Sequence, residues 1–261
     1  MVRDLQLKGE KAIVTGGTAG IGLAIARVLT EEGAEVTIPG RNSKKLSEAI
    51  SSLHGSARGI ELDLATAEGA ARLIAEVPET DILVNNLGIY EPKNFADITD
   101  EEWLHLFEVN VLSGIRLSRH YFPKMLAKDW GRVIFISSES AIMTPGEMVH
   151  YGMTKTAQLA ISRGMAEQTK GTRVTVNTVL PGPTRSEGIV GFLQNLASTP
   201  NATPEQAEKE FFEKYRGSSL LQRLIEDREV ADLVAYVASP LSSATNGAAL
   251  RVEGGLLRSI A

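Results

Sequence analysis

Cysteine is absent from this chain of 261 residues. Without cysteine there is no disulfide framework, no thiolate metal site and no cysteine nucleophile. Four histidines are present, at His54, His105, His120 and His150, and they show no metal-ligand spacing. A Gly-x-Ser-x-Gly turn, which would indicate a serine hydrolase, is also missing. We therefore expect neither a metal centre nor hydrolytic chemistry.

Long hydrophobic runs and an excess of charge of one sign are lacking as well. Hydrophobic residues make up 43% of the chain and charged residues 23%, as in ordinary globular proteins. The net charge is -5 and lysine and arginine form no stripe, which argues against nucleic acid and anionic membranes as main partners. No run suits a transmembrane helix, and Asp4, Lys8 and Glu10 precede any apolar run that would serve as a signal core. We expect a cytoplasmic protein with a small-molecule ligand.

Seven short apolar runs rich in valine and isoleucine alternate with longer amphipathic segments. The runs lie at 11–15, 35–38, 57–62, 81–85, 132–137, 173–179 and 248–252. They lack strict polar alternation, which suits strands that are buried on both faces. The helix-length segments lie near 20–32, 43–53, 66–77, 100–128, 151–169 and 227–238. Such alternation predicts one α/β domain over residues 1–261, with a doubly wound parallel sheet in three α/β/α layers.

One region departs from this alternation. Residues 184–217 contain two possible short helices joined by Ser-Thr-Pro-Asn-Ala-Thr-Pro, where a short connection is usual. We favour a substrate-side lid over a plain surface excursion. Its large apolar side chains would either line a pocket or pack the insert onto the body of the protein. They are Ile189, Val190, Phe192, Leu193, Phe211, Phe212 and Tyr215, and further candidates for the edge of a site are Tyr90, Met143, Met148 and Glu187.

Three glycines follow the first predicted strand and open the first predicted helix. In residues 15–22, Thr-Gly-Gly-Thr-Ala-Gly-Ile-Gly, Gly16 suits a tight turn out of the strand. Gly20 would let the backbone approach a pyrophosphate, and Gly22 would let helix and sheet pack closely. Glycines also occur in turns that bind nothing, but this position between strand and helix favours a nucleotide.

The spacing Gly-x-x-x-Gly-x-Gly resembles that of the short-chain dehydrogenases/reductases, and the resemblance extends over almost the whole chain. It implies a Rossmann-type fold and a nicotinamide dinucleotide cofactor. Asp63 is similar to the adenine-binding acid of this family, and residues 85–88 to its Asn-Asn-Ala-Gly motif, with Leu87 in place of alanine. Residues 181–184 resemble its Pro-Gly segment beside the nicotinamide. The expected cofactor-binding residues are Gly16, Thr18, Gly20, Ile21, Gly22, Arg41, Asp63, Leu64, Asn86, Gly88, Tyr151, Lys155, Pro181, Gly182 and Thr184.

The end of the second predicted strand bears on the choice of dinucleotide. NAD-using members of the resembled family carry an acid there, which would repel a 2′-phosphate. Here Gly40 stands at that position and is followed by Arg41, whose guanidinium matches phosphate geometry. We therefore favour NADP(H) over NAD(H), although Ala19 stands where many NADP-using relatives have a basic residue. The alternative is that Arg41 is a solvated arginine with Lys44 and Lys45 as neighbours on a helix face.

Tyr151 and Lys155 stand four positions apart at the start of the predicted helix 151–169. This spacing brings both side chains onto one helical face, where the charge of Lys155 would favour the phenolate of Tyr151. Ser138 ends a predicted strand thirteen residues before Tyr151, which is the spacing of the catalytic serine and tyrosine in the resembled family. Ser137 is the weaker candidate, because strand alternation turns it to the other side.

Asn110 provides evidence that is independent of the resemblance. A capping box at Thr99 and Glu102 opens its predicted helix, and Asn110 falls among the apolar residues of the buried face. A buried amide must find hydrogen-bond partners, which a structural bond to the backbone would provide. The resemblance implies that Asn110 also holds a water that continues a proton path from Lys155.

The resemblance thus implies four catalytic residues, Asn110, Ser138, Tyr151 and Lys155. Tyr151 would protonate a substrate oxygen, Lys155 would lower the pKa of Tyr151 and bond the nicotinamide ribose, and Ser138 would orient the carbonyl group. We expect an NADP(H)-dependent oxidoreductase for a ketone or aldehyde and its alcohol, similar to 3-oxoacyl reductases or general carbonyl reductases. The alternatives are an NAD-dependent alcohol dehydrogenase of the same family and a non-catalytic dinucleotide-binding or sensor protein. The family also implies a homotetramer or homodimer.

Overall fold

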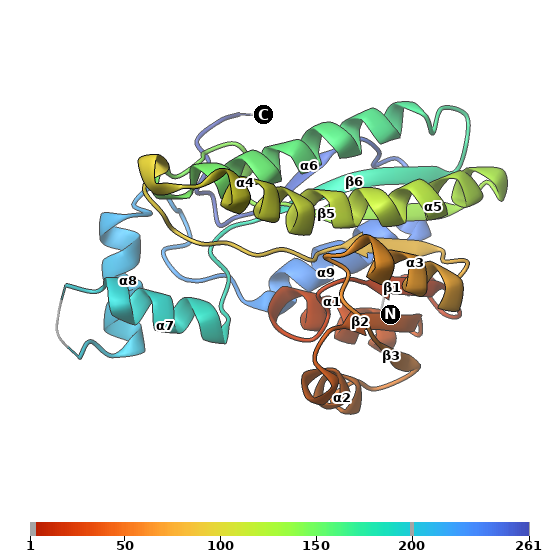
Figure 1. The fold of residues 1–261 in the computed structure, drawn as a ribbon, viewed down its shortest axis with the longest axis horizontal. Coiled ribbons are helices and arrows are strands. Elements are labelled where there is room, and N and C mark those ends of the chain that lie inside the picture. Colours follow the sequence, from red (N-terminus) through yellow and green to blue (C-terminus); the bar gives the residue numbers. More distant parts are fainter. Residues whose placement is uncertain (1–3, 199–200, 261) are drawn as a thin grey trace.

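The computed structural model describes residues 4–198 and 201–260. Within them, seven parallel strands form one sheet in the order β3-β2-β1-β4-β5-β6-β7 (Figure 1). The strands are β1 (Lys11–Val14), β2 (Glu35–Gly40), β3 (Ala57–Glu61), β4 (Ile82–Asn85), β5 (Gly131–Ile136), β6 (Val174–Pro181) and β7 (Ala249–Val252). β1 pairs with both β2 and β4, so the strand order reverses at β1. The predicted doubly wound, Rossmann-type α/β sheet is confirmed.

Helices cover both faces of the sheet. On one face, α1 (Gly20–Glu31), α2 (Ser43–Ser51) and α9 (Asp227–Ala238) contribute to one buried cluster. On the other face, α3 (Ala67–Glu76), α5 (Ser113–Ala127) and α6 (Val149–Glu167) contribute to a second cluster, and α4 (Asp100–Phe107) packs against α6. Short 3-10 helices lie at Phe95–Asp97, Glu139–Ala141, Gly146–Met148 and Pro240–Ser242. The predicted three α/β/α layers are therefore present.

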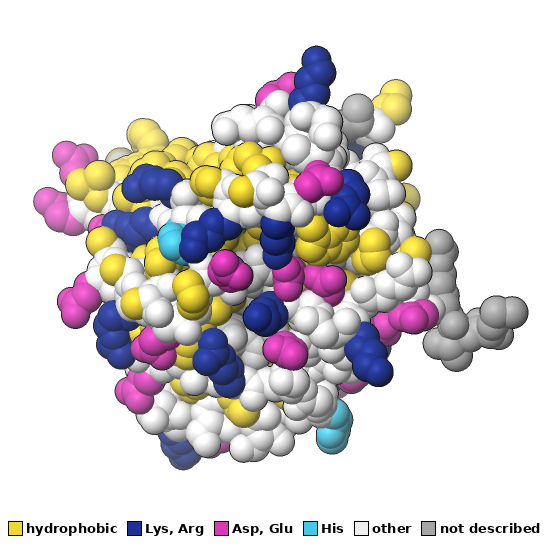
Figure 2. All heavy atoms as spheres, turned by 90° about the vertical axis from the view of Figure 1, so that its right-hand side faces the viewer, with side chains coloured by type: hydrophobic (Ala, Val, Ile, Leu, Met, Phe, Trp, Pro, Cys, Tyr) yellow, Lys and Arg dark blue, Asp and Glu magenta, His cyan; other side chains and the backbone are white. Residues whose placement is uncertain are grey.

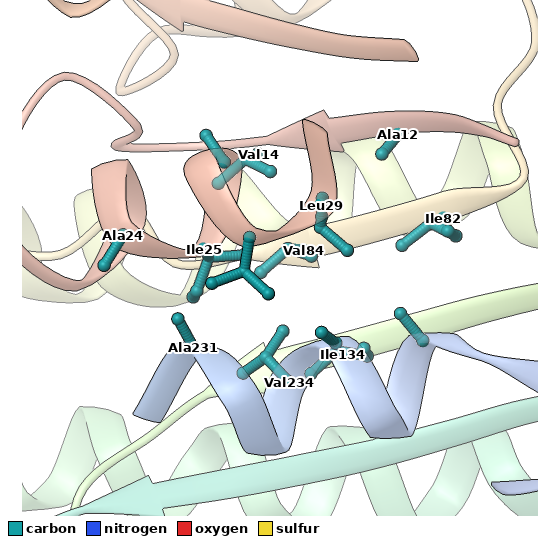
Figure 3. Close-up of a cluster of buried hydrophobic side chains, with 14 of the residues drawn as sticks. Ala12, Val14, Ala24, Ile25, Leu29, Ile82, Val84, Ile134, Ala231 and Val234 are labelled. Atoms are coloured by element: carbon teal, nitrogen blue, oxygen red, sulfur yellow. The ribbon is translucent and has the colours of Figure 1, made fainter. Parts of the chain in front are cut away.

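Successive residues of the central strands enter opposite clusters. Ala12 and Val14 of β1 pack with α1 and α9, whereas Ile13 between them packs with the residues of the other face. Figure 3 shows the first cluster, where side chains of α1, α9 and the strands gather. Because side chains alternate between the two faces of a strand and both faces are covered, these strands are continuous apolar runs in the sequence.

The helix predicted over 100–128 is not uniform. Between α4 and α5 the chain forms a π-helical segment, Glu108–Leu112. Ser113 Oγ donates to the carbonyl oxygen of Val109 at 2.6 Å and so satisfies one acceptor beside this wider turn. Hydrophobic periodicity does not separate a single π turn from the α turns around it, so the sequence did not predict the segment. The bounds of α6, in contrast, lie within two residues of the prediction.

The insert after β6 forms two helices at the carboxyl end of the sheet, α7 (Glu187–Leu196) and α8 (Pro204–Lys214) (Figure 1). They pack on each other around Leu193 and Phe212, in a cluster separate from the two clusters of the sheet. Some of the apolar residues of the insert therefore hold its own helices together, which was one of the two alternatives that the sequence left open.

The face of the molecule away from α7 and α8 gives little indication of a nucleic-acid ligand (Figure 2). Figure 2 shows the face away from α7 and α8, where basic and acidic side chains are interspersed and hydrophobic side chains gather in the upper part. A nucleic-acid surface would instead carry a stripe of basic residues. Among the helices of residues 4–198 and 201–260, none combines the length and the apolar character that a membrane span requires.

Candidate active site

A cavity of about 1190 Å³ lies at the carboxyl ends of the strands. Its walls come from the glycine turn after β1, the segments that follow β4, β5 and β6, the start of α6, and residues of α7 and α8. Open parallel sheets bind ligands at this edge, next to the reversal of strand order. The predicted site residues that line the cavity are Gly16, Thr18, Gly20, Ile21, Gly22, Asn86, Gly88, Ser138, Tyr151, Pro181, Gly182 and Thr184.

Glycine is required at three positions of the turn between β1 and α1, for backbone conformation at Gly16 and Gly20 and for space at Gly22. Gly16 and Gly20 have φ values of 63° and 51°, in the left-handed region that favours glycine. A Cβ atom added to Gly22 would lie 2.3 Å from the carbonyl oxygen of Gly16. Ala19 precedes α1 without a side-chain cap, so the first amide groups of the helix are left for an external anion. These features fit the pyrophosphate of a dinucleotide.

Hydrogen bonds from the segment after β4 fix this turn. Thr15 Oγ1 accepts from the amide groups of Asn86 and Leu87, both at 2.9 Å. Asn86 Nδ2 in turn donates to the carbonyl oxygens of Thr15 and Gly16, at 3.0 and 3.3 Å. The Asn-Asn-Leu-Gly motif and the glycine turn therefore form one continuous wall of the cavity.

The end of β2 has a small residue because its neighbour occupies the space. A Cβ atom added to Gly40 would lie 2.9 Å from Thr18 Cγ2, so an acidic side chain would displace Thr18. Thr18 and Lys45 line the cavity, whereas Arg41 is exposed and is not part of the cavity wall. The sequence-based prediction did not include Lys45 among the cofactor-binding residues and treated it only as a neighbour of Arg41.

The predicted adenine-binding pair, Asp63 and Leu64, is also set back from the cavity wall. Asp63 Oδ1 accepts from the amide group of Ala65 at 3.0 Å. Leu64 is buried in the second cluster, on the side of the sheet covered by α3, α5 and α6.

Residues after β6 close the cavity on the side of the insert. A Cβ atom added to Gly182 would lie 2.9 Å from Glu253 Cα, so only glycine fits against the end of β7. Thr184 Oγ1 donates to the carbonyl oxygen of Gly182 at 2.9 Å, and Thr184 forms an isolated parallel bridge with Ile225. The Pro-Gly-Pro-Thr segment is therefore held rigidly where it enters the insert.

Ser138, Tyr151 and Lys155 come together where β5 and α6 meet. Lys155 Nζ donates to the carbonyl oxygen of Ile136 at 3.0 Å and lies 5.5 Å from the centre of the Tyr151 ring. The Ser138 hydroxyl group lies close enough to Tyr151 to lower the pKa of its phenol. Ser137 donates to the backbone carbonyl of Lys155 at 2.8 Å, which commits its hydroxyl group to a structural bond.

Burial dominates the ionisation of these groups. It raises the pKa of Tyr151, and a negative charge on Glu139 would raise it further, whereas the influence of Ser138 lowers it. Burial lowers the pKa of Lys155 to about 8, against the opposing effect of Glu139. Because desolvation of the phenol is the largest influence, the pKa of Tyr151 is raised in this arrangement rather than lowered as expected.

Asn110 lies in the π-helical segment and is 1% exposed, as the periodicity predicted. Its Oδ1 accepts from the amide group of Ile89 at 2.8 Å, and its Nδ2 donates to the carbonyl oxygen of Ile89 at 2.9 Å and to Thr154 Oγ1 at 3.0 Å. The backbone carbonyl of Asn110 accepts from Gln158 Nε2 at 2.7 Å, and Gln158 Oε1 lies 3.5 Å from Lys155 Nζ. A glutamine side chain thus connects Asn110 with Lys155.

A family model described as short chain dehydrogenase matches residues 10–194. The chain belongs to this family. An uncharacterised oxidoreductase of Bacillus subtilis, YvaG, is 52% identical over 98% of this chain and 99% of its own length. The 3-oxoacyl-acyl-carrier-protein reductase FabG of Aquifex aeolicus is 30% identical over 97% and 99% of the two chains. The structure of L-sorbose reductase from Gluconobacter frateurii, complexed with NADPH and L-sorbose, superimposes with a TM-score of 0.91 at 26% identity and covers 99% of this chain and 100% of its own.

Membership makes the chain an oxidoreductase of a family that binds a nicotinamide dinucleotide. The match to the family model begins just before β1 and includes the glycine turn, the segment after β4, and the Ser138, Tyr151 and Lys155 cluster. The sequence-based identification of the short-chain dehydrogenases/reductases is confirmed.

Three polar residues of this short-chain dehydrogenase lie at the site although the sequence had not singled them out. Glu139 directly follows Ser138, and Gln158 lies on α6, one turn beyond Lys155. Arg216 follows α8 and lines the cavity from the side of the insert. The sequence carried a signal for two of them, because Glu139 is a charged residue at the end of an apolar strand and Gln158 stands three residues after Lys155 on the same predicted helix. Arg216 had no such signal.

Candidates for the edge of the site separate into two groups. Tyr90 and Met148 line the cavity, and the Tyr90 ring meets the Tyr151 ring edge to face at 6.1 Å. Met143 is 40% exposed and is not part of the cavity wall. The side chain of Glu187 lies outside the described residues.

From the insert, Ile189, Phe192, Phe211 and Tyr215 line the cavity. Ile189, Phe192 and Phe211 also pack in the cluster between α7 and α8, so both alternatives for the apolar residues of the insert apply.

His150 is not part of the cavity wall. Its side chain is 1% exposed and packs against Trp103 at 5.8 Å between ring centres, and burial lowers its pKa. Among the described residues, histidine and acidic side chains form no group of three or more that would hold a metal ion.

Proposed function

We propose that this short-chain dehydrogenase is an NADP(H)-dependent oxidoreductase that interconverts a ketone or aldehyde with an alcohol. The observation that carries the proposal is the position of Ser138 and Tyr151 in the wall of the same cavity as the glycine turn, with Lys155 against the Tyr151 ring. Groups for proton transfer and a cradle for pyrophosphate thus serve one bound pair of reactants. A dinucleotide sensor would need the cradle but not the buried tyrosine and lysine.

Each residue has a separate task in this reaction. The dinucleotide, when bound, supplies or accepts the hydride. Tyr151 gives a proton to the substrate oxygen in reduction and takes it back in oxidation, and Ser138 holds the same oxygen by a hydrogen bond. Lys155 is a suitable proton source for Tyr151 because its pKa of about 8 lies near neutrality. Asn110 acts indirectly, since it fixes the backbone of Ile89 next to Gly88.

We propose NADP(H) as the cofactor because Gly40 stands at the end of β2, where NAD-using members carry an acid. Thr18 occupies the space beside Gly40, and Lys45 adds a positive charge to the cavity wall. The complex of L-sorbose reductase with NADPH supports this choice. A putative NAD(P) dependent gluconate 5-dehydrogenase of Beutenbergia cavernae, 28% identical and with bound NADP, supports it as well. The adenosine end of the cofactor would then be contacted by Arg41, Asp63 and Leu64.

The insert and the assembly complete the proposal. We propose a single domain in which α7 and α8 form the substrate-side lid, because Ile189, Phe192, Phe211 and Tyr215 face the cavity from these helices and the segment after α8. The names of these relatives point to 3-oxoacyl-acyl-carrier protein, L-sorbose and gluconate 5-dehydrogenase substrates, so acyl and sugar-derived carbonyl compounds both belong in a substrate screen. A homotetramer, as the family resemblance implies, remains part of the proposal.

The decisive variant is Tyr151→Phe. It removes the proton donor but keeps the ring, so turnover should fall at least about 100-fold. NADPH binding, measured by the change in nicotinamide fluorescence, should stay within about twofold, since the phenyl ring keeps the packing. The assay follows NADPH oxidation over a panel of ketoses, simple ketones and 3-oxoacyl thioesters, with NADH in parallel.

Two results would overturn the proposal. If Tyr151→Phe retains turnover, the proton donor has been misassigned. If the unchanged protein binds NADPH but oxidises it with no member of the panel, the sensor alternative is favoured.

A further inference from the structure

Glu139 is a carboxyl group in an unusual place. It follows Ser138 directly, lines the cavity, and is only 6% exposed. Its carboxyl oxygens are hydrogen-bonded to the hydroxyl groups of Ser138 and Ser140. A buried carboxylate is costly unless it is paired, and none of the tasks assigned above requires a negative charge at this point.

The hydrogen bonds of Ser138 restrict the state of this carboxyl group. A hydroxyl group has one proton to donate and two lone pairs to accept with. Ser138 Oγ accepts from the amide group of Ser140 at 3.1 Å, is also bonded to Glu139, and lies near Tyr151. An ionised Glu139 only accepts, so it would take the single Ser138 proton, and that proton would no longer be available on the side of Tyr151.

We propose that Glu139 works as a neutral acid, donating to Ser138 Oγ so that the Ser138 proton points toward Tyr151 and the substrate oxygen. Glu139 is thus a positioning residue that acts through Ser138. The inference rests on the proposed function, because it assigns Ser138 to the substrate oxygen. It also gives the enzyme a dependence on pH that Tyr151 and Lys155 alone would not produce.

The groups that face Glu139 decide when it ionises. Tyr151 and Lys155 approach it from α6, and Arg216 from the segment after α8. Burial raises the pKa of Glu139, while the Ser138 hydrogen bond and the charge of Arg216 lower it to a smaller extent. A raised pKa means that the neutral form persists to higher pH. Ordering of Ser138 is therefore present below the pKa of Glu139 in the folded protein and is lost as the pH rises through it.

The experiment compares Glu139→Gln and Glu139→Ala. The glutamine amide donates a hydrogen bond at every pH, so kcat/KM for carbonyl reduction should stay within about threefold, and the alkaline decline caused by Glu139 should disappear. Alanine cannot donate, so kcat should fall about tenfold with little change in KM. Glu213→Gln, the same change at an exposed position of α8, should match the unchanged enzyme throughout.

A spectroscopic measurement tests the same point without turnover. The infrared difference spectrum of the ligand-free protein minus Glu139→Gln, at neutral pH, should contain the C=O stretching band of a protonated carboxyl group. Absence of that band, an unchanged pH profile in Glu139→Gln, or equal loss of activity in the two variants would each overturn the inference. Tyr151→Phe in the same assay separates a failure of this inference from a failure of the proposed function. If Tyr151→Phe is inactive and the Glu139 variants are unaffected, only the role of Glu139 fails.

Discussion

At the end of β2, two basic side chains differ in their access to the cavity. Lys45 is part of the cavity wall beside Thr18, whereas Arg41 is exposed outside it. Asn42 lies between them in the chain and caps α2, accepting from the amide group of Lys45 at 2.9 Å. The cap fixes the backbone that carries Lys45, so its ammonium is the better placed of the two to meet a 2′-phosphate.

Exchange of Lys45 or Arg41 for alanine therefore tests the preference for NADPH over NADH. A charge-assisted hydrogen bond contributes about 1.5 to 3 kcal/mol, so Lys45→Ala should raise KM for NADPH at least about tenfold and leave KM for NADH within about twofold. Arg41→Ala should raise KM for NADPH by a smaller factor, because an exposed charge is screened by solvent. Steady-state kinetics with both dinucleotides provides the measurement. Equal effects of Lys45→Ala on NADPH and NADH would contradict a phosphate contact.

Spacing in the sequence was sufficient to bring Ser138, Tyr151 and Lys155 to one site, because their separations are fixed by one strand end and one helix. It was not sufficient for Glu139 or Gln158. The direction of a side chain just past a strand depends on the local 3-10 turn at Glu139–Ala141, which has no simple pattern. The direction of the Tyr151 pKa shift was missed for a related reason, since the extent of burial is a property of the assembled fold.

At the scale of elements, the π-helical segment and the insert contrast with the regular sheet. The central strands were predicted closely because both of their faces are covered, which leaves short continuous apolar runs as a signal. The π turn depends on partners far away in the chain, such as Gln158 Nε2 on the Asn110 carbonyl, 48 residues apart. The packing of α7 on α8 depends in the same way on contacts that periodicity within one helix does not specify.

Because α7 and α8 pack in a separate cluster, a mutation in that cluster should destabilise these two helices without destabilising the sheet. Phe212 is 2% exposed at its centre, so Phe212→Ala should cost about 3 to 5 kcal/mol of local stability. Hydrogen exchange should accelerate in α7 and α8 while the amides of β1, β4 and β5 keep their protection. KM for substrate should rise as well, because Phe211 of the same helix lines the cavity.

A matched control is Phe95→Ala, since Phe95 is 65% exposed. It should change the stability by no more than about 0.5 kcal/mol and leave exchange in α7 and α8 unchanged. Uniform acceleration across the sheet in Phe212→Ala would show that the insert unfolds together with the body and would contradict an independent unit.

At the scale of the whole molecule, the cavity joins elements that pack into different clusters. The glycine turn belongs to the layer of α1, Tyr151 to the layer of α6, and Phe192 to the insert. A dinucleotide in the cavity would contact all three, so its binding free energy should stabilise the whole fold rather than one element. The hydrogen bonds of Asn86 to the glycine turn extend this coupling to β4.

Thermal unfolding with added dinucleotide tests this coupling. At about 100 times its Kd, a ligand that binds only the folded state adds about 2.7 kcal/mol, which for a chain of this size raises Tm by about 5 to 10 °C. At equal concentration NADPH should raise Tm more than NADH. Gly22→Ala should abolish the rise, because the new Cβ atom lies 2.3 Å from the Gly16 carbonyl and must distort the cradle. Gly164→Ala, where the added Cβ atom has no neighbour within 4 Å, should retain it. If Gly22→Ala keeps the full rise while its circular dichroism shows an intact fold, the dinucleotide does not bind at the glycine turn.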